Sequence, residues 1–138
     1  MKTLGLLLFG LSACNTDEGL KAFNSNPEAT ITSHSDGDSI TAGESIGLRG
    51  SVSDPNNSSE DLTATWFTDT GVLCESTAAQ ADGTVLCDAS LDTNLGTITL
   101  EVKDPSGAAG SDQLSLNIIN PAPVVNIGFP ANGAQLDD

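Results

Sequence analysis

Hydrophobic and polar residues alternate with a period of two through most of the chain after residue 26. Apolar residues or glycine occupy every second position at 29–31, 46–52, 62–66, 98–102 and 114–118, and apolar pairs at 72–73 and 85–86 mark two shorter segments. Threonine, serine and charged residues fill many of the intervening positions. Such alternation is typical of strands with one buried and one solvated face. The pattern therefore predicts about seven short strands and no long helix.

Turn-forming residues separate these segments. Glycine, proline, aspartate and asparagine supply the backbone conformations and side-chain hydrogen bonds that tight turns need. They cluster at 36–38, 42–43, 54–57, 69–71, 82–83 and 104–107. The fold prediction is an all-β protein, in which residues 26–120 form an antiparallel, immunoglobulin-like β-sandwich of about seven strands.

Residues 1–13 have the makeup of a secretory signal peptide. Lys2 gives a positive start, a run rich in leucine follows, and small residues stand at positions 12 and 13. The run is too short for a transmembrane helix, which needs about 20 apolar residues. Leu11-Ser12-Ala13-Cys14 closely resembles the bacterial lipobox, which implies cleavage before Cys14 and a diacylglycerol on its sulfur. An ordinary secretory signal with an incidental cysteine is the alternative.

The chain is strongly acidic. It has 19 aspartates and glutamates against 4 lysines and arginines, and its net charge of −15 becomes −16 if Lys2 leaves with the signal. Such a chain is repelled by phosphate backbones and anionic head groups, so nucleic acid is not an expected partner. Residues 14–25 are polar and are predicted to form a flexible lipidated tether. We therefore expect membrane attachment through the lipid on Cys14 alone.

The predicted location is the cell envelope. Enteric-type lipoproteins that stay in the inner membrane often carry aspartate directly after the lipidated cysteine, whereas this chain has Asn15. The resemblance to such lipoproteins therefore favours the outer membrane, with the periplasmic and surface faces both left open.

The remaining cysteines are Cys74 and Cys87. An even pair in an oxidising compartment predicts a disulfide bond, and closing a loop of this size stabilises a fold by roughly 3 kcal/mol. Two reduced, buried thiols are the alternative. A metal pair is not expected, because the chain offers one histidine and no second ligand pair.

The C-terminal residues 121–138 repeat the first predicted strand at a shift of 96 positions. The matches pair Pro123 with Pro27, Val125 with Ala29, Ile127 with Ile31, Gly133 with Gly37 and Leu136 with Ile40. Because 96 residues is about the length of one sandwich, we predict that 121–138 is the first strand of a truncated second repeat. A proline-rich tail with chance matches is the alternative.

Three stretches resemble the tandem immunoglobulin-like repeats of bacterial surface proteins, near the polycystic-kidney-disease-type (PKD) and cadherin-like modules. They are the opening at 26–55, Leu62-Thr63-Ala64-Thr65-Trp66, and the strand and turn at 98–107. The resemblance implies the fold and a core tryptophan at Trp66, and it implies no activity. The residues after Trp66 depart from the PKD pattern. The antibody pattern of cysteines on facing sheets is not expected, since both cysteines follow Trp66.

Candidate chemistry is sparse. His34 stands between serines and aspartates, but neighbouring residues of one strand point to opposite faces, so these residues do not predict a catalytic triad. His34 is instead expected to be an exposed residue beside a turn. Asp54, Asn56 and Asp104 lie on predicted turns and carry the oxygen ligands that calcium takes, although their spacing is not that of an EF-hand. The default expectation is turn formation, with no cofactor.

These observations predict a non-catalytic, lipid-anchored envelope protein whose module serves as a spacer, an adhesive unit or a binding unit for an extracellular protein or glycan. One alternative is the N-terminal accessory module of a larger exported hydrolase. Another is a calcium-dependent adhesin or carbohydrate-binding module.

Overall fold

The computed structural model describes residues 23–92, 96–126 and 128. The predicted signal peptide, Cys14 and most of the predicted tether lie outside these ranges. In chain order the elements are β1 (Glu28–Ile31), β2 (Ser39–Thr41), β3 (Ser45–Ser53), the 3-10 helix η1 (Ser59–Asp61), β4 (Thr63–Thr68), β5 (Gly71–Ala78), β6 (Thr84–Ser90), β7 (Thr97–Lys103), β8 (Ala109–Ser115) and β9 (Asn117–Ile119).

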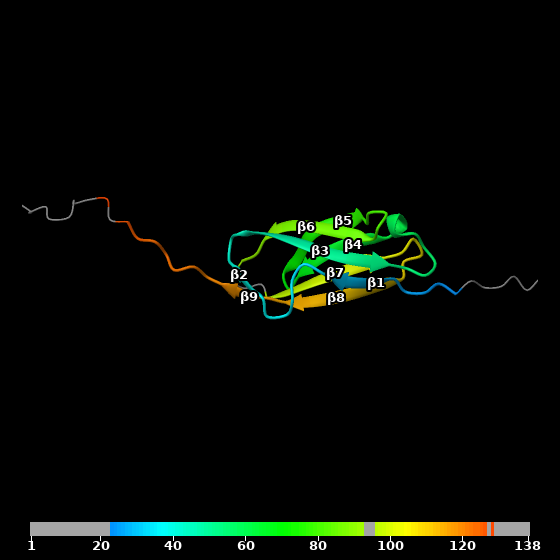
Figure 1. Ribbon diagram of the computed structural model, residues 1–138, viewed down its shortest axis with the longest axis horizontal. Coiled ribbons are helices and arrows are strands. Elements are labelled where there is room, and N and C mark those ends of the chain that lie inside the picture. The colour runs from blue at the N-terminus through cyan, green and yellow to red at the C-terminus, as the bar shows by residue number, and fades with distance from the viewer. Residues whose placement is uncertain (1–22, 93–95, 127, 129–138) are drawn as a thin grey trace, which may run out of the picture.

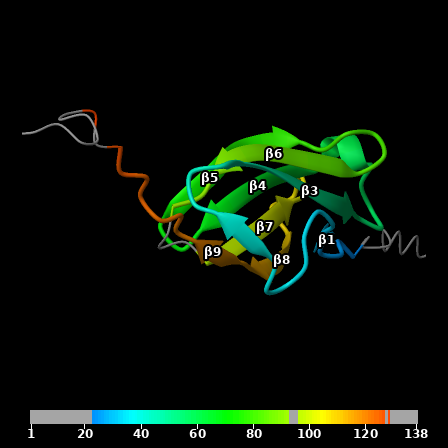
Figure 2. The ribbon, with the colours of Figure 1, turned by 60° about the vertical axis from the view of Figure 1, so that its left-hand side comes forward.

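Two antiparallel sheets pack face to face (Figure 1 and Figure 2). One has three strands in the order β1-β3-β6, and the other has four in the order β5-β4-β7-β8. A short parallel pair, β2 with β9, lies beside them. No α-helix occurs in the described residues. The predicted all-β, immunoglobulin-like sandwich is therefore confirmed.

The core follows the predicted alternation. In β3 every second residue is buried and those between are exposed, and in β7 Ile98, Leu100 and Val102 are at most 1% exposed. Burial of such side chains is the main favourable contribution to folding, at about 25 cal/mol per Å² of apolar surface. Gly50 belongs to the buried face of β3, and a Cβ atom there would lie 2.4 Å from Cδ2 of Leu100 in the opposite sheet. Glycine at this position lets the two sheets approach closely.

Trp66 lies at the centre of this core. Its side chain is 1% exposed, and in the sheet it stands opposite Cys74 of β5 and Leu100 of β7. Its indole nitrogen has no hydrogen-bond partner among the described residues. Trp66 therefore contributes packing to the sandwich rather than a surface for stacking ligands.

The disulfide joins the two sheets. Cys74 and Cys87 are bonded, with their Cα atoms 5.9 Å apart, and they lie on β5 and β6, the outer strands of different sheets. The bond differs from the antibody pattern, in which the two cysteines flank the core tryptophan in sequence, but it does connect facing sheets. Both cysteines do follow Trp66, but the chain passes from one sheet to the other between β5 and β6.

The described part of the C-terminal segment extends away from the sandwich (Figure 1). Residues 121–126 form no strand and are exposed, with Val124 at 96% and Val125 at 80% exposure. Most of the predicted second repeat lies outside the described residues, so it stays a prediction. None of the helices in the described ranges is long and apolar enough to cross a membrane.

Candidate functional site

The segment that enters the sandwich is attached to two loops at one end of it, which we call the N-terminal pole (residues 24–27, 54–58 and 104–108). The side-chain amide of Asn24 donates a hydrogen bond to Oδ2 of Asp104. The backbone N–H of Ser25 donates to Oδ1 of Asn56 at 2.7 Å. Because Asn24 and Ser25 are neighbours, the loop after β3 and the loop after β7 lie side by side here.

Asp54 builds the first of these loops. Its Oδ1 accepts hydrogen bonds from the backbone N–H groups of Asn56 at 2.7 Å and Asn57 at 2.8 Å. This is the local side-chain bonding through which aspartate forms turns. Asp54 Oδ2 and Asn57 Oδ1 are buried without a protein partner in the described ranges.

Asp104 builds the second loop and is only 6% exposed. Its Oδ1 accepts a hydrogen bond from the N–H of Ala108 at 2.8 Å, and its carbonyl oxygen accepts one from Gly107 at 3.1 Å. The hydrogen bond from Asn24 is the main cause that lowers the pKa of Asp104 below its ordinary value, with backbone N–H groups of the loop adding to it and desolvation opposing it. The carboxylate is therefore held in its charged form by donors that surround it.

A close backbone contact completes the attachment. Pro27 is buried. A Cβ atom placed on Gly110 of β8 would lie 1.9 Å from the carbonyl oxygen of Pro27, so the two backbones are in close contact. Further along, the N–H of Ile31 donates to Oδ2 of Asp112 at 2.7 Å. These contacts connect β1, in the three-stranded sheet, to β8 in the other sheet, so the entering segment becomes part of the folded module.

The three residues that the sequence suggested for calcium thus meet in one region. Asp54 and Asp104 use carboxylate oxygens to bind backbone amides, and Asn56 binds Ser25. In the described ranges no group of three or more histidine, cysteine, aspartate or glutamate side chains is placed to hold a metal ion. Calcium binding stays a prediction, and the turn-forming roles of these residues are what the geometry shows.

The aspartates beside His34 also bind backbone. Oδ2 of Asp38 accepts from the N–H of Ser35, and Oδ1 of Asp36 accepts from the N–H of Ser115, each at 2.8 Å. His34 is half-buried rather than exposed as expected, and its Nδ1 has no partner in the described part of the chain. These residues therefore form no Ser-His-Asp relay.

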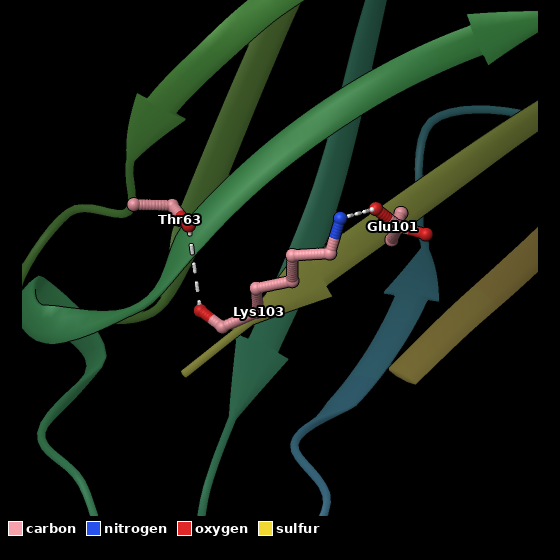
Figure 3. Close-up of polar contacts among 3 residues, drawn as sticks. All are labelled: Thr63, Glu101 and Lys103. Carbon is pink, nitrogen blue, oxygen red and sulfur yellow. Dashed lines mark hydrogen bonds and ion pairs between the residues drawn. The ribbon is translucent and has the colours of Figure 1, made fainter. Parts of the chain in front are cut away.

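The outer face of the four-stranded sheet is polar. Nζ of Lys103 lies 2.6 Å from Oε1 of Glu101, and the hydroxyl of Thr63 makes a long hydrogen bond of 3.5 Å to the carbonyl oxygen of Lys103 (Figure 3). Both charged side chains are substantially exposed, so this ion pair adds little stability. Phe67 lies half-buried in β4. One ring of this kind does not form a stacking platform, so the face is a solvated surface.

No protein-family model matches the chain, and no curated protein sequence does. Solved structures match it in fold. Fibronectin(III)-like modules of Clostridium thermocellum CbhA match with a TM-score of 0.52 and 17% identity, over 72% of this chain and 50% of that one. The chain carries an immunoglobulin-like β-sandwich module. At this identity the likeness extends to the fold and not to a ligand or an activity.

Two other structures have similar sandwiches. A PKD domain of an M14-like peptidase from a Thermoplasmatales archaeon matches with a TM-score of 0.49 and 16% identity, over 69% of this chain and 99% of that one. The twitchin kinase region of C. elegans matches with a TM-score of 0.47 and 16% identity, over 66% of this chain and 16% of that one. The module thus spans half of the CbhA structure and a small part of the twitchin one.

Proposed function

We propose that this protein is a lipid-anchored spacer of the cell envelope, in which the module holds whatever follows it at a set distance from the membrane. One observation carries the proposal: the chain enters the sandwich at one end and leaves it at the opposite end (Figure 1). Asn24 and Ser25 are bonded to the N-terminal pole, so the length of the sandwich separates the two attachment points. A spacer requires this geometry.

The anchor in this proposal is the lipid on Cys14. Eight residues lie between Cys14 and Phe23, the first described residue, so nine residue-to-residue steps join them. A fully extended chain gains at most about 3.6 Å per residue, so the tether reaches about 30 Å at most. Because Asn24 and Ser25 are bonded to the two loops of the N-terminal pole, the chain after Phe23 adds little to this reach. The module would therefore stay close to the membrane, held by two or more acyl chains.

The disulfide supports export. A bond between Cys74 and Cys87 forms and persists in oxidising compartments such as the periplasm or cell surface. Whether a catalytic domain is attached is a separate matter: in the alternative of an accessory module, the reading frame past Asp138 would encode a hydrolase.

The proposal is tested by expressing the full chain in a bacterial host and analysing membrane fractions by mass spectrometry. We expect a mature N-terminus at Cys14 carrying acyl chains. Cys14→Ser should leave the signal uncut by the lipoprotein pathway and move any processed protein to the soluble fraction. The matched control Cys74→Ser should stay with the membrane. Retention of processed Cys14→Ser protein in the membrane after a high-salt wash, or a mature wild-type chain without lipid, would refute the anchor.

A further inference from the structure

β9 holds the chain up to the point where it leaves the sandwich. It pairs in parallel with β2, and the register sets Ile119 beside Thr41. The N–H of Ala42 donates a hydrogen bond to the carbonyl oxygen of Ile119, and that of Gly43 donates to Leu91, each at 2.9 Å. We call residues 41–44, 91 and 119 the exit end. Beyond it the described residues 120–126 run away from the sandwich (Figure 1).

The residues that attach the chain to the N-terminal pole recur directly after β9. At the repeat shift of 96 positions, Asn120 matches Asn24 and Pro123 matches Pro27. Asn24 donates its side-chain amide to Asp104, and Pro27 is buried. The last strand of this module is therefore followed at once by the entry sequence of a second one.

This second entry sequence lacks the cover that the first one has. Pro123 is exposed, whereas Pro27 is buried. Val125 is 80% exposed, whereas its counterpart Ala29 packs against the core. In a chain with a net charge of −15, residues 113–136 carry no charge at all. Contiguous exposed apolar residues of this kind mark a segment that another surface covers, and the remaining strands of a second module would supply that surface.

The connection between the two modules is short. Three residues, Asn120, Pro121 and Ala122, lie between Ile119 and Pro123. The four residue-to-residue steps that join Ile119 to Pro123 span at most about 14 Å when fully extended. Because Ile119 is fixed in the first module and the counterpart of Pro123 is buried in its own, the two modules must lie next to each other.

The connection is also stiff. Pro121 and Pro123 each fix their own φ angle near about −65° and restrict the residue before them to extended conformations, so all four residues from 120 to 123 are constrained. One contact cannot recur, because Pro121 stands where Ser25 donates its N–H to Asn56, and proline has no N–H. The stiffness therefore comes from the restricted backbone and not from that hydrogen bond.

The two ends of the module present surfaces that can meet. At the exit end Ile119 is 49% exposed. In a second copy of the module, the N-terminal pole would present Pro55 and Pro105, which are exposed here. Contact between these groups removes apolar surface from water. The carboxylates of Asp54 and Asp104 accept hydrogen bonds from backbone N–H groups of the pole itself, so part of their charge is compensated within the module.

We propose that the exit end is an interaction surface for the N-terminal pole of a second module of the same fold in the same chain, and that the two modules form one stiff unit. The inference rests on the proposed spacer role and extends it. A flexible tether connects the membrane to the first module, whereas the connection between modules keeps their separation and orientation fixed.

The test uses the chain from residue 15 with the module duplicated in register. Residues 15–123 are joined directly to residues 28–138, so that 120–123 take the place of 24–27 in the second copy. NMR relaxation of the backbone amides gives the rotational correlation time of the folded modules. In a stiff unit this time should be at least about twice that of the single-module chain, because tumbling slows with the volume that moves together. A matched control carries about six flexible glycine and serine residues after Ile119 and should tumble like the single module.

Limited proteolysis shows whether each copy is folded. Equal correlation times for the direct tandem and the control, with both copies folded, would overturn the proposal. A second copy that folds only in the control would also overturn it, because the two ends could then not lie in contact. A second copy that folds in neither would show that 120–123 is not an entry sequence. These chains lack Cys14, so the result does not depend on the lipid anchor, and its failure would leave the anchor standing.

Discussion

Replacing Gly110 by alanine should detach the entering segment from the module. The added Cβ atom would lie 1.9 Å from the carbonyl oxygen of Pro27 and 2.9 Å from its carbonyl carbon. The obstacle is backbone, so no side-chain rotation relieves the clash. To reach an ordinary contact distance, the backbone at Pro27 must retreat by about 1.5 Å. The hydrogen bond from the N–H of Ser25 to Oδ1 of Asn56 is 2.7 Å long, and a bond stretched by that much is lost.

The magnitude follows from the cost of inserting a methyl group into a packed site, about 1–3 kcal/mol. Because backbone must move, we expect the upper half of this range, about 2–3 kcal/mol. For a domain of this size each kcal/mol corresponds to roughly 4–8 °C, so the melting temperature should fall by roughly 10–20 °C. Gly47→Ala is the matched control, since its nearest contact would be 3.4 Å, and it should change stability by less than about 0.5 kcal/mol.

Urea and thermal unfolding report the loss through the fluorescence of the buried Trp66. Hydrogen exchange reports where it occurs, because the N–H of Ile31 is bonded to Asp112 and should exchange faster in Gly110→Ala. Equal melting of Gly110→Ala and the wild type would refute the reasoning. So would a loss of stability with unchanged exchange at Ile31, because β1 would then have stayed in place.

Three further predictions concern the core and the pole. Replacing Cys74 and Cys87 together by serine should lower the free energy of unfolding by roughly 3 kcal/mol, measured by urea titration. Leu100→Ala should cost about 2–5 kcal/mol in the same assay, because Leu100 is fully buried between the sheets. The lowered pKa of Asp104 predicts a stabilising contribution that is complete above its ordinary value of 3.8 and lost as pH falls through the folded-state pKa. Over that acidic range the urea midpoint of Asp104→Asn should fall less steeply than that of the wild type, and parallel pH profiles would contradict this.

The strands that the sequence predicted best are those with one complete apolar face. β3 and β7 alternate over their full lengths, so their period is visible in the residues themselves. β5 runs from Gly71 to Ala78, whereas its apolar pair marked only Val72 and Leu73. Most of β5 is exposed at the edge of its sheet, so burial imposes no alternation there. The full length of β5 is recognised as a strand only through its antiparallel pairing with β4.

Elements defined by distant partners were not recognised: β2 was missed, and the predicted strand at 114–118 joined the end of β8 to the start of β9. β2 and β9 have three residues each and lie 78 positions apart in their register, as Ser39 with Asn117 and Ile40 with Ile118. Neither is long enough to display a period. His34, which was expected to be exposed, is half-buried and lines a shallow hollow together with β2. No signal in the local sequence could have revealed this pairing.

The sequence predicted which residues of the N-terminal pole carry oxygen ligands, but it did not predict that the segment before β1 is bonded to them. Turn chemistry marked Asp54, Asn56 and Asp104 as a source of oxygen ligands, and the structure does bring them together. What satisfies them is the chain's own backbone and the amide of Asn24, which lies 80 positions before Asp104. A polar tether residue looks the same in sequence whether it is free or bonded, so the attachment depends on a contact that only the fold creates.

The two long sides of the sandwich are closed by different means, and this explains where the disulfide lies. On one side β1 approaches β8, and the hydrogen bond from Ile31 to Asp112 connects the sheets. On the other side β5 and β6 are the outer strands of their sheets among the residues that the structure describes, and an unpaired edge is where a sandwich opens most easily. The bond between Cys74 and Cys87 crosses that side. Two cysteines only 13 positions apart can connect facing sheets because the chain changes sheets between them, and this placement joins the two sheets along the side formed by β5 and β6.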